Sequence, residues 1–128
     1  MLQENGKIML TSDASNVAIG AVLEQEIDNK ISPFGFYSQK LKSEETRYST
    51  FDKELLAIFK SIKHYKYILE NRRFRLYTDH KPLTDMYNLK DPSPRQLRKI
   101  NYISRFNLEI QPIAGKSNIV ADYLSRTD

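Results

Sequence analysis

Residues 49–79 read STFDKELLAIFKSIKHYKYILENRRFRLYTD, and this stretch decides the fold. Apolar side chains recur in its first part at spacings of three and four, which predicts an amphipathic helix that starts near Ser49 or Thr50 and ends at about Leu69. Residues 73–79 then alternate between apolar and polar side chains, which predicts a strand. The apolar face of the helix consists of Phe51, Leu55, Ile58, Ile62, Tyr65 and Leu69.

One glutamate of this helix has an unusual position. Glu54 lies one turn before Ile58, at the border of the apolar face, whereas Lys53, Lys60 and Lys63 fall on the other side. A fully solvated helix would carry its glutamate among the lysines. We therefore expect the Glu54 side chain to point toward the sheet that the helix covers.

Three strand patterns precede the helix. The turn signal Asp28-Asn29 separates the second from the third and predicts that the third returns antiparallel. Pro33 and Gly35 indicate that this third strand lies at a sheet edge or contains a bulge. The three predicted strands are residues 7–13, 17–26 and 30–39.

The order strand, helix, strand predicts a right-handed crossover that joins two parallel strands. Asp13 ends the first strand and Asp79 ends the strand that follows the helix. Both aspartates are therefore expected at the carboxyl ends of neighbouring strands, where open α/β sheets place their sites.

The rest of the chain adds smaller elements. We expect a short helix that opens at Pro82, a loop over residues 91–94 and a basic helix over residues 95–105. A fifth strand over residues 107–113 follows, and then a last helix. The predicted cap of that last helix is Ser117 or Asn118.

Composition narrows the function classes. The 128 residues predict one globular domain, since 40% are hydrophobic. The chain has no cysteine, which excludes disulfides, thiolate zinc sites and a cysteine nucleophile. No apolar run approaches the roughly 20 residues that cross a membrane, and the first residues show no signal-peptide pattern. The net charge of +4 suits a polyanionic partner.

Four acidic residues carry the chemical signal: Asp13, Glu54, Asp79 and Asp122. Each alone is unremarkable, because strand-end aspartates are usually turn residues and helical glutamates are usually solvated. Two strand ends and two helices can, however, bring all four to one point. Such a cluster needs a counter-charge. Hard divalent cations supply it, and two of them can drive phosphodiester cleavage.

Four motifs occur in a fixed order along the chain: TSDASN, FDKELLAI, YTDHKPL and AGKSNIVADYLSR. From about Lys7 to Arg126 the chain resembles the ribonuclease H domain of gypsy-type LTR retrotransposon polyproteins. The resemblance implies a ribonuclease H-like α/β fold: a five-stranded mixed sheet, with three antiparallel strands and then parallel strands, flanked by helices. It also implies that residues 1–128 form one domain, a fragment of a longer polyprotein in which it follows a reverse transcriptase.

The same resemblance implies an activity: hydrolysis of the RNA strand of RNA–DNA hybrids during retroelement reverse transcription. In the family, the residues at Asp13, Glu54, Asp79 and Asp122 are the catalytic metal ligands for two Mg²⁺ ions, and Mn²⁺ is expected to substitute. The implied partners are the hybrid and the reverse transcriptase domain of the same polyprotein, with no membrane. The implied location is intracellular, in the virus-like particles of the retroelement.

Substrate contacts are expected on both sides of the carboxylates. Groups beside Asp13 and before Glu54 are placed to reach 2′-hydroxyls in a shallow minor groove. The basic helix offers candidates for phosphate contacts, which would make binding fall with salt. The nucleic-acid-binding candidates are Ser15, Asn16, Arg47, Ser49, Thr50, His80, Arg95, Arg98, Lys99 and Arg105.

The chain departs from the family pattern at two places. Related enzymes often carry a histidine or tyrosine ten residues before the last aspartate, where this chain has Pro112, which cannot titrate. Slower turnover is expected, unless another residue such as His80 takes the role. The basic helix reads Arg98-Lys99 where the family commonly has Arg-Trp, and the chain has no tryptophan.

Two other functions share this fold. A non-catalytic binding module, such as a degenerate connection domain, would be expected to have lost its metal ligands, and the intact set of four carboxylates argues against it. A transposase or integrase uses a different carboxylate set, and the motif KELLA argues against that. Binding of two Mn²⁺ per chain would favour the nuclease, and binding of none would favour the binding module.

Overall fold

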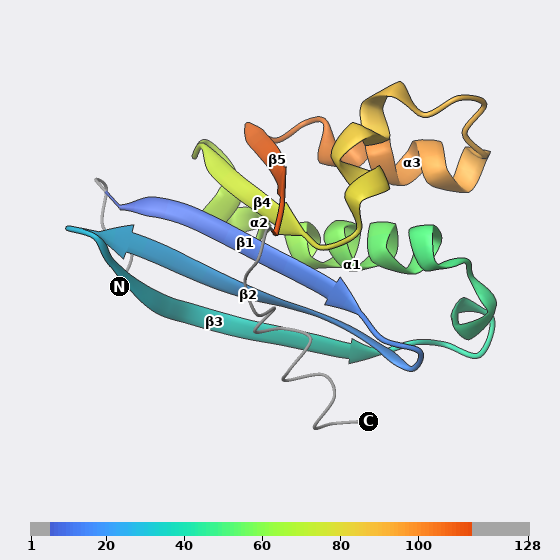
Figure 1. Cartoon of the computed structure of the whole chain (residues 1–128), viewed down its shortest axis with the longest axis horizontal. Helices are drawn as coiled ribbons and strands as arrows, with labels where there is room; N and C mark the ends of the chain where they lie inside the picture. The colour runs from blue at the N-terminus through green and yellow to red at the C-terminus, as the bar shows by residue number, and fades with distance from the viewer. Residues whose placement is uncertain (1–5, 114–128) are drawn as a thin grey trace.

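The computed structural model describes residues 6–113. The predicted last helix at Ser117 or Asn118, and the fourth carboxylate Asp122, lie outside the described residues. Within them, five strands form one mixed sheet in the order β3-β2-β1-β4-β5 (Figure 1), which confirms the predicted sheet. The strands are β1 (Lys7–Ala14), β2 (Ala18–Ile27), β3 (Lys30–Lys40), β4 (Phe74–Thr78) and β5 (Leu108–Pro112).

The helices of the described range include two 3₁₀ helices. One of these, over Glu45–Arg47, was not predicted, and the segment that opens near Pro82 is 3₁₀ rather than α-helical. No helix among residues 6–113 combines the length and apolar character needed to span a membrane. The helices are η1 (Glu45–Arg47), α1 (Thr50–His64), α2 (Lys66–Leu69), η2 (Lys81–Asn88) and α3 (Pro94–Ile103).

The first three strands form an antiparallel meander, as predicted. Asp28 and Asn29 have φ values of 52° and 66° and join β2 to β3 in a two-residue turn. Turns with two positive φ values match the right-handed twist of the strands, and Asp and Asn tolerate them better than most residues.

Strand β3 lies at the sheet edge and also contains a bulge. Leu23 pairs with Gly35 whereas Glu24 pairs with Pro33, so Phe34 has no counterpart in β2. Proline cannot donate a ladder hydrogen bond, so it fits at an edge or a bulge. Both features predicted from Pro33 and Gly35 are therefore confirmed.

The parallel pairing of β1 and β4 positions Asp13 and Asp79. Strand β4 pairs with β1 from Ile8↔Phe74 to Thr11↔Tyr77. Asp13 and Asp79 each lie two residues beyond that last pair. Because the strands run in the same direction, residues equally far past the last pair come side by side at one end of the sheet.

Helix α1 packs against β1 and β2, and α3 lies beside α1 (Figure 1). The predicted apolar face of α1 is the buried one, since Leu55, Ile58 and Ile62 are at most 1% exposed. Ile100 and Ile103 of α3 join the same core. A core of this kind holds α1 against the strands that carry the aspartates.

The prediction of one continuous helix to Leu69 was wrong. The backbone leaves helical geometry at Tyr65, with φ −101° and ψ 18°, and α2 follows as a separate short helix. The ring of Tyr65 packs on Gly35, where a Cβ atom would lie 2.9 Å from the tyrosine oxygen. The break therefore coincides with a close approach between the helix and the edge strand.

Candidate active site

Three of the four predicted carboxylates meet at one end of the sheet. Asp13 comes from β1, Glu54 from the second turn of α1, and Asp79 from the residue after β4. One carboxylate oxygen of each lies within 4.8 Å of the other two. The fourth, Asp122, is outside the described residues. The arrangement follows from the in-register end of the β1–β4 pair and from a helix that crosses above it.

Burial distinguishes the three carboxylates. Asp13 and Glu54 are each 6% exposed, whereas Asp79 is exposed. The Oε1 atom of Glu54 is buried and has no hydrogen-bond partner among residues 6–113. A buried carboxylate oxygen without a partner is costly, because its lost hydration is not replaced.

Burial and mutual repulsion raise the pKa values of Asp13 and Glu54. Burial, together with the negative charge of Asp79, raises the pKa of Asp13 to about 6. Burial, together with the charges of Asp13 and Asp79, raises the pKa of Glu54 to about 9. Without a cation, the group therefore keeps a proton at neutral pH, because three negative charges cannot coexist at this separation in a dry site.

These residues fit a hard divalent cation. Carboxylate oxygens are the ligands that Mg²⁺ and Mn²⁺ prefer. A cation would give the Oε1 atom of Glu54 a partner and would replace the proton that the cluster otherwise needs. The exposure of Asp79 leaves the cluster accessible from solvent on one side.

A pocket of about 270 Å³ opens beside the carboxylates. Two of its residues, Ser15 and Asn16, follow Asp13 in the β1–β2 turn, and Thr50 begins α1. The hydroxyl oxygen of Ser15 accepts hydrogen bonds from the backbone N–H groups of Val17 and Ala18, which fixes the turn. The lining residues are Ala14, Ser15, Asn16, Thr50, Lys53 and Glu54.

Lys53 is the member of this lining that sequence reasoning missed. Its position on the polar side of the helix indicated a solvated lysine, but the side chain is half-buried beside Glu54. The signal that could have indicated this was its place directly before Glu54, near the start of the helix.

The other candidates near α1 have defined local roles. Ser49 caps the helix, since its Oγ atom accepts a hydrogen bond of 3.1 Å from the backbone N–H of Asp52. His80 is half-buried, with its ring edge-on to Phe51 at a centroid distance of 6.0 Å. Arg47 is exposed in η1. These three residues lie around the start of α1, and none of them lines the pocket.

The basic residues of α3 do not converge on the carboxylates. The Arg95 guanidinium lies 3.3 Å from a carboxylate oxygen of Asp52, so it forms an ion pair at the protein surface. Lys99 is half-buried, with its ammonium 5.9 Å from the ring centroid of Phe59. Burial, together with the charge of Arg95, lowers the pKa of Lys99. Arg98 is exposed.

Arg105 lies at the far end of the molecule from the carboxylates. Its guanidinium lies over Tyr102, and it shares a surface pocket with Glu70 and Asn71, just after α2. Sixteen residues separate Glu54 from Glu70, a length of about 20 Å or more along the two helices. Only a substrate that extended over the whole length of α1 could contact both regions.

Pro112 is the last residue of β5 and pairs with Thr78, one residue before Asp79. It is exposed. The position that often carries a histidine or tyrosine in related enzymes therefore lies close to the carboxylates, and here it has no side chain that could transfer a proton.

Residues 3–106 match the family model described as the RNase H-like domain found in reverse transcriptase. The chain belongs to this family. It is 42% identical over 125 residues to the transposon Tf2-3 polyprotein of Schizosaccharomyces pombe, and the Tf2-4 polyprotein of that yeast gives the same figures. Each match covers 94% of this chain and 9% of the polyprotein, so the chain spans about a tenth of these relatives.

Solved structures with this fold include the foamy viral protease-reverse transcriptase in complex with double-stranded DNA, at a TM-score of 0.75 and 10% identity. That match covers 93% of this RNase H-like domain and 26% of the viral chain. LC11-RNase H1 in complex with an RNA/DNA hybrid gives a TM-score of 0.68 at 15% identity, over 92% of this chain and 93% of that one. Both likenesses show the fold, including the five-stranded mixed sheet.

Proposed function

We propose that this chain is the ribonuclease H domain of a gypsy-type LTR retrotransposon Pol polyprotein and that it hydrolyses the RNA strand of RNA–DNA hybrids. The observation that carries the proposal is the meeting of Asp13, Glu54 and Asp79, with one buried oxygen of Glu54 left without a partner among residues 6–113. Membership of the RNase H-like family of reverse transcriptases supports the same reading of the site.

The residues that would hold the metal are Asp13, Glu54 and Asp79, with Asp122 as the proposed fourth ligand. A pair of Mg²⁺ ions bound there would supply an activated water and would neutralise the charge that develops on the leaving 3′-oxygen. Mn²⁺ is expected to replace Mg²⁺ because it prefers the same oxygen ligands.

The protein groups around the metal have separate tasks. The buried positions of Asp13 and Glu54 keep their carboxylates out of bulk water, so their charges interact more strongly with a bound cation. Asn16 and Thr50 line the pocket beside them and are proposed to contact the minor groove, where 2′-hydroxyls distinguish RNA from DNA. Lys53 adds a positive charge at the same pocket, suited to a backbone phosphate.

The proposed function implies a polyprotein context for the chain. Residues 1–128 are proposed to form one domain within a longer polyprotein, with the reverse transcriptase domain of that polyprotein as partner. The match to the Tf2 polyproteins over about a tenth of their length supports a fragment of this kind. The proposed location is inside the cell, in the virus-like particles of the retroelement.

The test is cleavage of an end-labelled RNA–DNA hybrid in Mg²⁺ and in Mn²⁺, with duplex DNA of the same sequence as control. The parent chain is expected to cut only the RNA strand, and Asp79→Asn is expected to remove the activity. If the hybrid binds and neither metal supports cleavage, even with the polymerase domain attached, the nuclease proposal is wrong and a binding module is favoured.

A further inference from the structure

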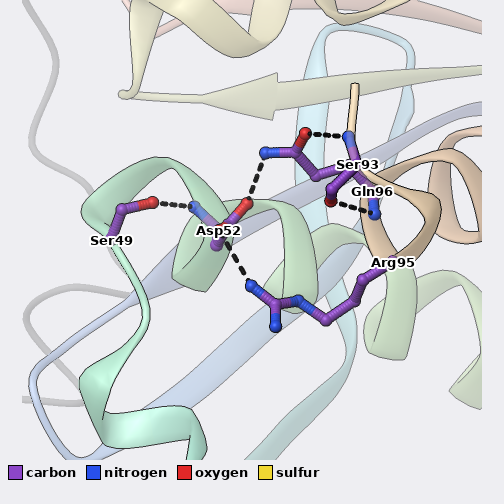
Figure 2. A network of polar contacts seen from close by, with 5 residues as sticks. All are labelled: Ser49, Asp52, Ser93, Arg95 and Gln96. Carbon is purple, nitrogen blue, oxygen red and sulfur yellow. Dashed lines mark hydrogen bonds and ion pairs between the residues drawn. The ribbon is translucent and has the colours of Figure 1, made fainter. Parts of the chain in front are cut away.

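A network of polar contacts joins the first turn of α1 to the first turn of α3 (Figure 2). Asp52 is at its centre. One carboxylate oxygen accepts a hydrogen bond of 2.8 Å from the Gln96 amide, and the other lies 3.3 Å from the Arg95 guanidinium. These partners are 43 and 44 residues away in the sequence, so they connect two elements that no short loop links.

Gln96 is itself fixed on the α3 side. The side-chain Oε1 atom of Gln96 accepts a hydrogen bond from the backbone N–H of Ser93, and the backbone N–H of Gln96 donates to the Ser93 hydroxyl oxygen. This reciprocal capping box satisfies two backbone donors at the start of α3. The Nε2 atom remains for Asp52, so the amide is held by contacts at both its ends.

Arg95 extends the network toward the chain that enters α1. Its guanidinium carbon lies 4.2 Å from the ring centroid of Tyr48, while its Nη2 atom contacts Asp52. Tyr48 immediately precedes the helix cap Ser49, and Thr50 of the pocket follows it. One arginine therefore connects the entry to α1 with the first turn of that helix.

Asp52 and Glu54 are two residues apart, which places them about 200° apart around the helix axis. Glu54 faces the other carboxylates, and Asp52 faces α3. Phe51 in the first turn packs against the core but is only partly buried, and the fully buried apolar side chains of α1 begin with Leu55. The first turn therefore has fewer buried apolar contacts than the later turns, and the polar network adds contacts there.

Resting on the proposed nuclease function, we propose that Asp52 is a positioning residue and that, together with Arg95 and Gln96, it fixes the first turn of α1 so that Glu54 and Thr50 are held in place for metal and substrate. Arg95 then acts through Asp52 and is not a phosphate contact. An error of about 1 Å in the position of a reacting group is enough to slow catalysis, so a network of contacts away from the metal can affect the rate through geometry.

A purely stabilising role and a positioning role predict different results. The Arg95 side chain is 45% exposed and the Asp52 side chain 15%, so the ion pair is partly screened by solvent and contributes modestly to the free energy of unfolding. A role limited to stability would leave the metal affinity and the cleavage rate of the folded protein unchanged. Metal affinity and cleavage rate, measured on the folded variants, therefore distinguish a positioning role from a purely stabilising one.

The experiment is a double-mutant cycle on Asp52→Ala and Arg95→Ala in the full chain, with two readouts below the melting transition. The first is Mn²⁺ affinity by titration without nucleic acid. The second is kcat and KM for the hybrid, with the dependence of binding on salt. Each single variant should lower Mn²⁺ affinity or kcat by roughly 3- to 10-fold, and the double variant should lose no more than the worse single one.

Two variants serve as matched comparisons. Asp52→Asn keeps an acceptor for Gln96 but removes the charge, so it should recover part of the loss seen in Asp52→Ala. Arg98→Ala removes an exposed cation from the same helix. If Arg98 contacts phosphate, its variant should reduce the slope of log affinity against log salt by about 0.7–0.9, whereas Arg95→Ala should leave that slope unchanged.

The proposal is overturned if Arg95→Ala reduces the salt slope and raises KM while Asp52→Ala changes neither kcat nor Mn²⁺ affinity. It is also overturned if the losses of the two single variants add up in the double variant. Because Mn²⁺ affinity is measured without substrate, failure of the parent chain to cut the hybrid would count against the proposed function and would leave this test decisive.

Discussion

The two ends of the α1–α2 segment differ in what surrounds their side chains: carboxylates at the start and mainly apolar residues at the end. At its start, Glu54 is buried, one of its oxygens has no hydrogen-bond partner within residues 6–113, and it lies beside two other carboxylates. At its end, Ile62 and Leu69 are fully buried among apolar side chains, and the Tyr65 ring packs closely on Gly35, although the Tyr65 hydroxyl is also buried without a hydrogen-bond partner among residues 6–113. The first end gathers three carboxylates that need a cation or protons, whereas the second is stabilised mainly by buried apolar side chains. The comparison shows that apolar contacts hold the segment against the sheet, while its start carries carboxylates that keep a proton until a cation binds.

The largest expected effect tests the polar end. Glu54→Gln should reduce cleavage of the hybrid by more than about 100-fold, because loss of a metal ligand should exceed the 10- to 100-fold cost of losing a partner of such a ligand. Glu70→Gln, an exposed carboxylate at the other end, is the matched control and should retain the parent rate. Cleavage by Glu54→Gln at the parent rate would exclude Glu54 from the metal site.

The second prediction uses pH to sharpen the comparison. The pKa of Glu54 is raised from 4.5 to about 9, so the folded state keeps a proton that the unfolded state has lost between these values. The free energy of unfolding from this group should therefore be highest below about pH 4.5 and should fall as the pH rises toward 9. Asp13, with its pKa raised to about 6, adds to the fall between about pH 4 and 6.

Urea denaturation in EDTA from pH 5 to pH 8 measures this dependence. Other groups also titrate, so the relevant quantity is the difference between the parent chain and Glu54→Gln. As the pH rises, Glu54→Gln should become more stable relative to the parent chain. Saturating Mg²⁺ should make the parent chain the more stable of the two. A difference that stays constant with pH would show that Glu54 is already ionised in the metal-free protein.

The third prediction concerns the apolar end. Gly35→Ala should lower the free energy of unfolding by about 1–3 kcal/mol, because the new Cβ atom would overpack the Tyr65 hydroxyl. Mn²⁺ affinity should not change. Tyr65→Phe should rescue Gly35→Ala, since it removes the oxygen at the 2.9 Å contact. If the double variant is no more stable than Gly35→Ala, then that contact does not explain the glycine.

The smallest effect tests the cap of α1. Ser49→Ala removes the hydrogen bond to the Asp52 backbone N–H and should cost about 1 kcal/mol of unfolding free energy. Ser43→Ala, six residues earlier and exposed, is the control and should have no measurable effect. An equal loss in both variants, measured by thermal denaturation, would show that the cap does not stabilise the helix.

Local patterns in the sequence predicted most of the elements. The spacing of Leu55, Ile58 and Ile62 identified the buried face of α1, because helical periodicity is repeated in the residue order itself. Asp28-Asn29 predicted the hairpin turn for a similar reason, since few residues accept two positive φ values in succession. The positions of Asp13 and Asp79 followed from the crossover rule, because parallel strands end at the same edge.

What the sequence alone could not supply is contact between segments far apart in the chain. The break at Tyr65 coincides with the close approach of an edge strand some 30 residues earlier, and the network around Asp52 depends on partners more than 40 residues later. Sequence reasoning therefore assigned Arg95 to phosphate and Lys53 to solvent. The residue types and their order determined the strands, the helix and the carboxylates. Helical spacing also predicted that Glu54 points toward the sheet. Only the tertiary structure decided how deeply Glu54 is buried, its raised pKa and the partners of Asp52, because these are properties of packed neighbours and are not encoded in any local spacing.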